Sequence, residues 1–123
     1  MTLHGAQYKV MSAATLSGYL VRNRDDEDLG CIEELMMNPE TGRVAYAILS
    51  FGGFLGFGGK LYAVPWSALE LDPEERVFLL NADRETLEKA PAFQEENWPD
   101  FGDLDWGSKV HQFYGLRPYW ECA

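Results

Sequence analysis

A glycine-rich segment near the middle of the chain is the first place where the sequence could do chemistry. It spans residues 52–60 and carries Phe54, Leu55 and Phe57 among its glycines. Glycine-rich backbone can cradle phosphate groups with its N–H groups, but a phosphate-binding loop ending at the segment's lysine needs glycine at Phe54, and the dinucleotide fingerprint needs glycine at Leu61. We therefore expect a tight connection between two strands. Its apolar tip either contacts a partner or folds back over the end of a barrel.

The titratable residues form no recognisable catalytic or metal-binding pattern. The acidic run at residues 25–28 lacks the alternating ligand spacing of a calcium loop and is typical of a solvated turn. His4 and His111 are the only histidines, and neither belongs to a Cys/His cluster of the kind that binds zinc. Cys31 stands in a strand-like run with no histidine placed near it, which favours a small buried thiol. The sequence predicts no catalytic residue, no metal ligand and no cofactor.

The excess of acidic over basic residues limits the kinds of partner that the chain can bind. Asp and Glu number 20 against 10 Lys plus Arg, which gives a net charge of -10. Such a surface repels phosphate backbones, so we expect no nucleic-acid binding; it would attract a basic protein or simply keep the chain soluble. No apolar run reaches the roughly 20 residues that span a bilayer, and the first nine residues lack a secretory signal. We expect a cytoplasmic protein without direct membrane insertion.

The elements that must position these residues are mostly strands. Between Gly18 and Ala82, short apolar runs rich in β-formers alternate with turn residues, which is typical of a small all-β barrel or sandwich. The predicted strands are Tyr19 to Arg22, Cys31 to Met37, Arg43 to Phe51, Leu61 to Trp66 and Arg76 to Leu80. Proline and glycine at residues 38–42, and proline again at 72–75, predict hairpin turns.

Two of these strands carry further information. In the second strand the spacing of Ile32, Leu35 and Met37 breaks a period of two, which a β-bulge near Glu33 and Glu34 would resolve. The third strand is apolar at both its odd and its even positions, so both of its faces should be covered. The inner face should lie in the barrel interior, and the tail should cover the outer face.

Helical signals begin after Ala82. Asp83 is a good N-cap for a short helix over 84–89, and Pro91 prevents its continuation. A second helix is predicted over 104–114. These boundaries divide the chain into an N-terminal arm (1–11), a barrel domain (12–82) and a C-terminal extension (83–123) whose one or two short helices pack on the barrel.

The C-terminal extension is rich in large aromatic side chains, which include Trp106, Phe113, Tyr114, Tyr119 and Trp120. One small barrel has a narrow lumen that its own inward residues fill, so these rings must cover its outside or meet a second copy. We expect a two-fold homodimer through the loop tip, the tail or both, because aromatic residues are favoured at interface centres. The alternative is a tail that wraps its own barrel.

Three segments carry a family resemblance: residues 29–35, 41–56 and 63–69, the last containing Val64-Pro65-Trp66-Ser67. They closely resemble the bacterial stand-alone PRC-barrel proteins, and the match continues to Pro99. The resemblance implies a mainly β fold, a small PRC-type barrel of five to six strands with a short C-terminal helical extension. Related barrels occur in the cytoplasmic domain of the photosynthetic reaction centre H subunit and in the ribosome maturation factor RimM. This chain lacks the transmembrane helix of the former and the separate N-terminal barrel of the latter.

The resemblance implies a barrel that docks onto other macromolecules and is not a catalyst. The resulting hypothesis is a non-catalytic interaction or adaptor module that self-associates and docks onto another protein. The alternative is a small-molecule-binding or metal-dependent enzyme whose site is assembled from scattered acids. An enzyme should show converging polar groups in a cleft, whereas a module should show an apolar surface patch.

Overall fold

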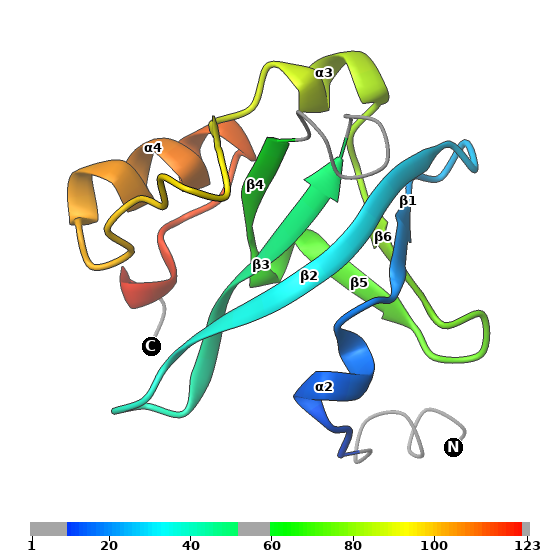
Figure 1. Ribbon diagram of the computed structural model, residues 1–123, viewed down its shortest axis with the longest axis horizontal. Coiled ribbons are helices and arrows are strands. Elements are labelled where there is room, and N and C mark those ends of the chain that lie inside the picture. Colours follow the sequence, from blue (N-terminus) through cyan, green and yellow to red (C-terminus); the bar gives the residue numbers. More distant parts are fainter. Residues whose placement is uncertain (1–9, 52–59, 122–123) are drawn as a thin grey trace.

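The computed structural model describes residues 10–51 and 60–121, and its architecture is mainly β, as predicted. The described strands are β1 (Leu20–Arg22), β2 (Asp28–Asn38), β3 (Arg43–Phe51), β4 (Lys60–Pro65), β5 (Leu69–Asp72), β6 (Val77–Leu80) and β7 (Ala92–Phe93). The helices are α2 (Ala13–Leu16), α3 (Arg84–Glu88) and α4 (Leu104–Phe113), with 3-10 turns η1 (Trp66–Ala68) and η2 (Tyr119–Glu121). Figure 1 shows α4 beside the sheet and α3 across one end of it.

The described strands form one mixed sheet in the order β5-β6-β1-β2-β3-β4-β7. All neighbours are antiparallel except β1 and β6, which are parallel. The sequence predicted five of these seven strands and missed β5 and β7. Among the described strands the two end strands, β5 and β7, are not neighbours, so the sheet is not closed by hydrogen bonds into a complete barrel.

The hairpins and the bulge lie where the sequence predicted them. The register of β2 against β3 shifts between Ile32 and Glu34, which confirms the expected bulge. A second shift lies between Met36 and Met37. The β2–β3 turn contains Gly42 at a φ of 76°, and the turn at residues 73–76 joins β5 to β6.

The sheet curls around a single inner core. Buried side chains from β1, β2, β3, β4 and β6 meet there, and Leu87 of α3 closes one end. Strand β4 ends at Pro65, one residue before the predicted end at Trp66, and the ring of Trp66 then packs edge-on against Phe78 with 5.6 Å between centroids. Since each inward side chain is removed from water, this apolar core supplies the main driving force for folding.

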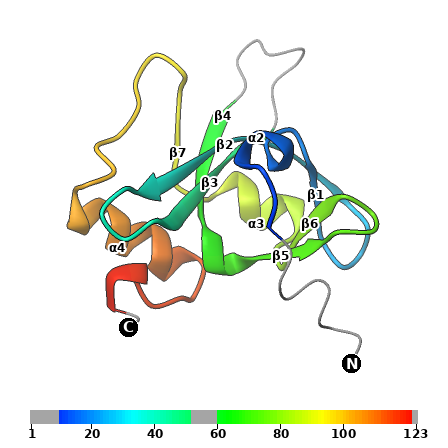
Figure 2. The same ribbon diagram turned by 90° about the horizontal axis from the view of Figure 1, so that it is seen from below.

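Strand β3 is covered on both faces, as its sequence predicted. Ala47 and Leu49 point into the inner core, whereas Tyr46 and Ile48 point outward into a second cluster. That cluster is completed by Val110 of α4 and by aromatic side chains of the C-terminal extension. In Figures 1 and 2 this extension runs along the outer side of β3 and β4, so the tail covers its own sheet.

Both predicted helices are present and begin at aspartate caps. Asp83 Oδ1 accepts a hydrogen bond from the Thr86 backbone N–H at 2.7 Å. Hydrogen bonding from the Thr86 side chain, and next from this N–H, lowers the pKa of Asp83. Asp103 Oδ1 accepts from the backbone N–H groups of Asp105 and Trp106 at the start of α4. An aspartate cap satisfies N–H groups that have no partner within the helix.

Candidate interaction surface

The outer cluster is built around Tyr46, whose side chain leaves the middle of β3 and is 1% exposed. Four rings surround it at centroid distances of 5.4–6.0 Å, those of Phe101, Trp106, His111 and Tyr119. Tilted and edge-on arrangements of this kind are the favourable ones for aromatic rings. Tyr46 is therefore one main point at which the C-terminal extension packs on the outer face of the sheet.

His111 fastens the last part of the chain to α4. Its ring is fully buried. Nδ1 lies 2.8 Å from the Gly107 carbonyl oxygen and Nε2 lies 3.3 Å from the backbone nitrogen of Tyr119. Because the Tyr119 N–H can only donate, Nε2 accepts and Nδ1–H donates to Gly107, which fixes one neutral tautomer. The histidine thus has a structural role that the sequence did not reveal.

The structure brings most of the predicted aromatic residues of the tail together. Trp106 and Tyr119 contact Tyr46, and Trp120 contacts His111 with 5.6 Å between ring centroids. Phe113 and Tyr114 pack against the inner core, and Tyr114 also reaches the outer cluster. All five side chains are half-buried. Phe54, Leu55 and Phe57 of the predicted loop tip lie outside the described residues.

A hollow of about 300 Å³ opens beside this cluster, between the β2–β3 hairpin and the C-terminal extension. The described residues that line it are Met36, Met37, Asn38, Pro39, Ala45, Tyr46, Phe101, Gly102 and Tyr119. Figure 2 shows the hairpin projecting alongside α4 and the end of the chain. We call this feature the hairpin hollow. Its described lining has no carboxylate, histidine, lysine or cysteine, and the titratable side chains in it are those of Tyr46 and Tyr119.

Sequence reasoning did not single out Met36 and Met37 of the hairpin hollow, whereas Phe101 belongs to the large aromatic residues of the tail that it expected to cover the barrel or to meet a second copy. The pair of methionines at the end of a strand was the available signal, because a flexible thioether is common at adaptable binding surfaces. The register shift between Met36 and Met37 could not be predicted, and it leaves Met37 54% exposed. Phe101 belongs to a loop whose position depends on α4, which no local pattern shows.

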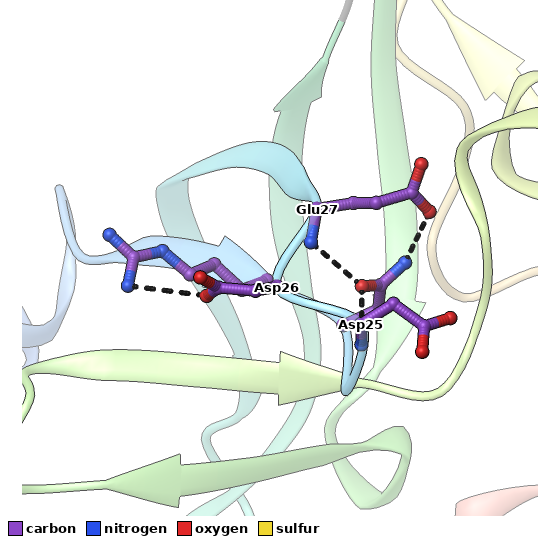
Figure 3. Close-up of polar contacts among 5 residues, drawn as sticks. Asp25, Asp26 and Glu27 are labelled. Carbon is purple, nitrogen blue, oxygen red and sulfur yellow. Dashed lines mark hydrogen bonds and ion pairs between the residues drawn. The ribbon is translucent and has the colours of Figure 1, made fainter.

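The acidic turn between β1 and β2 is organised by Asn23 and is drawn in Figure 3. The Asn23 side chain is buried; its Oδ1 accepts from the N–H groups of Asp25 and Glu27, and its Nδ2 donates to Glu27 Oε1 and to the Ala82 carbonyl. Asp26 adopts a φ of 64° and lies 3.7 Å from Arg22. The prediction of a turn is confirmed, and its hydrogen bonds within the chain account for its shape.

Cys31 lies in β2, where its side chain is half-buried, so the expected full burial was wrong. Its Sγ is 3.8 Å from Glu33 Oε2. Burial, followed by the negative charge of Glu33, raises the pKa of the Cys31 thiol. Since the thiolate is the reactive form, this environment makes Cys31 a poor nucleophile.

Residues 10–51 and 60–121 contain no group of three or more His, Cys, Asp or Glu side chains placed to hold a metal ion. No helix in that same part of the chain is both long and apolar enough to cross a bilayer.

The fold is thus a curled β-sheet domain whose outer face is covered by its own C-terminal extension. Residues 9–87 match the model of the PRC-barrel domain, and the chain belongs to that family. Among similar solved structures is a 16S ribosomal RNA processing protein, RimM, from Pseudomonas aeruginosa, with 14% sequence identity and a TM-score of 0.43. The match covers 65% of this chain and 48% of that protein, so this chain spans about half its length. No curated protein sequence matches this chain.

Proposed function

We propose that this chain is a non-catalytic interaction module that docks onto another protein. The observation that supports this function best is the hairpin hollow, an apolar depression next to an exposed methionine and half-buried aromatic rings. Exposed apolar patches of this kind mark interaction sites, whereas an enzyme site needs converging polar groups. The enzyme alternative has no comparable support among the described residues.

Affinity capture from the source organism, followed by reconstitution, tests this function. The tagged chain is used as bait, captured proteins are identified by mass spectrometry, and each is purified and mixed with the chain. We expect at least one stoichiometric complex to form again from purified components. Failure of every captured protein to form a complex would contradict the proposal, and so would turnover of a small molecule by the chain alone.

Self-association is the second part of the proposal. It is supported by the end strand β5, which among the described strands pairs with β6 alone. Unpaired strand edges readily add a strand from another molecule, and two-fold symmetry is the commonest arrangement. Analytical ultracentrifugation at tens of micromolar should show a species of twice the chain mass. A single monomeric species at that concentration would exclude the homodimer.

A further inference from the structure

The charged residues directly next to the lining of the hairpin hollow are all acidic. Only three charged residues stand directly next to a described lining residue in the sequence, and they are Glu40, Asp100 and Asp103. All three are acidic and exposed. Two positions away, Glu34 and Glu121 are balanced against two arginines, Arg43 and Arg117. Arg43 already interacts with another residue of the chain.

Two of these carboxylates are held in place at the rim. Asp100 Oδ1 accepts from the Gly102 N–H at 2.9 Å, and Asp103 Oδ1 accepts from the Asp105 N–H at 2.9 Å. In the sequence, Asp100 and Asp103 lie on either side of Phe101 and Gly102, which form part of the lining. The result is an apolar floor with fixed negative charges at one border.

We propose that the hairpin hollow binds a basic segment of another protein, with one apolar or aromatic side chain inserted between Met37 and Phe101. This inference rests on the proposed function and names its surface and its partner chemistry. The apolar lining accounts for the anchor, because burial of one large side chain in a desolvated pocket dominates the affinity of most interfaces. The acidic border accounts for the basic flanks, because complementary charge steers association and selects partners.

The hollow combines two parts of the chain. Met36 to Pro39 and the residues of β3 fall within the family match at 9–87, whereas Phe101, Gly102 and Tyr119 follow it. The C-terminal extension thus does more than cover the sheet, because it supplies one wall of the binding surface.

Fluorescence anisotropy with short labelled peptides tests the proposal. The probe has a central phenylalanine flanked on both sides by lysine and arginine; one control replaces the phenylalanine with glycine, and another replaces the basic flanks with glutamate. We expect saturable binding of the probe that weakens as salt is raised, and at least about tenfold weaker binding of both controls, which is 1.4 kcal/mol. Equal binding of the glycine control would overturn the apolar anchor, and equal binding of the glutamate control would overturn the charge selection.

Two pairs of variants locate the site. Met37→Gln removes an exposed apolar side chain from the hollow, and Leu20→Gln removes one from β1, outside it. Glu40→Gln removes a charge at the rim, and Glu75→Gln removes one from the β5–β6 turn. We expect the first member of each pair to weaken probe binding severalfold and the second to leave it unchanged, with circular dichroism unaltered in all four.

Three results would overturn the assignment of this surface. They are no binding of the probe, equal effects within each pair of variants, and loss of self-association in Met37→Gln with probe binding intact, which would assign the hollow to a second copy. Complexes reconstituted from captured proteins would still support the proposed function after any of these results. A wrong assignment of the binding surface can therefore be distinguished from a wrong function.

Discussion

The hydroxyl group of Tyr46 is buried and has no hydrogen-bond partner among the described residues, and the same is true of Tyr114. A buried polar group without a partner costs about 1–3 kcal/mol of stability. Tyr46 nevertheless sits at the centre of the outer cluster, where its ring contacts four others. Its ring and its hydroxyl therefore have opposite effects on stability.

Replacement of Tyr46 separates the two effects. Tyr46→Phe keeps the ring and removes the unsatisfied hydroxyl, so we expect the free energy of unfolding to stay the same or to rise by up to about 1 kcal/mol. Tyr46→Ala removes the ring and should cost about 3–5 kcal/mol, as for large aromatic deletions in cores. Urea denaturation measures both. A loss of more than about 1 kcal/mol in Tyr46→Phe would show that the hydroxyl has a favourable partner.

Alanine substitutions at two glycines with positive φ separate the cost of backbone strain from the cost of steric overlap. Gly18 and Gly30 have φ values of 96° and 106°. A Cβ at Gly18 would meet no other atom within 4 Å, whereas one at Gly30 would overlap the backbone carbonyl oxygen of Ser50 on β3. We expect Gly18→Ala to cost about 1–2 kcal/mol from strain alone and Gly30→Ala to cost clearly more, because β2 and β3 must separate there. Thermal unfolding compares them, and equal losses would contradict the close approach.

Among the elements, α4 and η2 are joined by His111, whose ring bonds to the Gly107 carbonyl within α4 and accepts a hydrogen bond from the Tyr119 N–H of η2. His111→Leu keeps an apolar side chain in place but leaves the Gly107 carbonyl and the Tyr119 N–H without these partners, so we expect a loss of about 1–3 kcal/mol and altered near-ultraviolet circular dichroism. Gln112→Leu changes the exposed neighbour on the same helix and serves as the control. An unchanged spectrum together with unchanged stability in His111→Leu would show that η2 is held by packing alone.

The elements differ in how far the sequence could predict them. The hairpin turns, the bulge near Glu33 and the Asp83 helix cap follow from local chemistry, so they were predicted correctly. Strands β5 and β7 have four and two residues, and a strand that short is defined by its partners more than by its own pattern. The same reason explains why the sequence could not show that the sheet lacks hydrogen-bonded closure among its described strands.

The candidate site was predicted only in part. The aromatic residues of the tail could be named because large rings in a polar, acidic segment need a cover. Tyr46, the ring partner of Trp106 and Tyr119, could not be named, since every residue from Ala45 to Leu49 is apolar and the sequence does not say which face α4 covers. Met37 was missed for a related reason, because the nearby register shift changes which side chains are exposed.

At the scale of the whole molecule, the chain has two apolar layers that share β3 and β4. The inner layer fills the curled sheet, and the outer layer joins the sheet to the part of the C-terminal extension that follows the family match, which ends at residue 87. Tyr114 packs against both layers. We infer that unfolding of the extension exposes Tyr46 and Ile48, so the extension and the sheet should unfold together.

Three tyrosines with raised pKa values make this coupling measurable at high pH. Burial raises the pKa of Tyr46, Tyr62 and Tyr114 above the ordinary value of 10.0, with further increases from Tyr119, Glu88 and Tyr62 respectively. Unfolded tyrosines ionise near pH 10.0, so above that pH the folded protein holds protons that the unfolded chain has lost. The stability from these groups is therefore complete below pH 10 and is lost as the pH rises toward the raised folded-state values.

We expect urea denaturation to show falling stability above pH 10 and the tyrosinate absorbance of these residues to appear together with the loss of both layers. Tyr46→Phe combined with Tyr114→Phe should make that fall shallower, because two of the three groups no longer titrate. Ionisation of all six tyrosines near pH 10 with the native circular dichroism retained would contradict the burial of these hydroxyls and the coupling of the two layers.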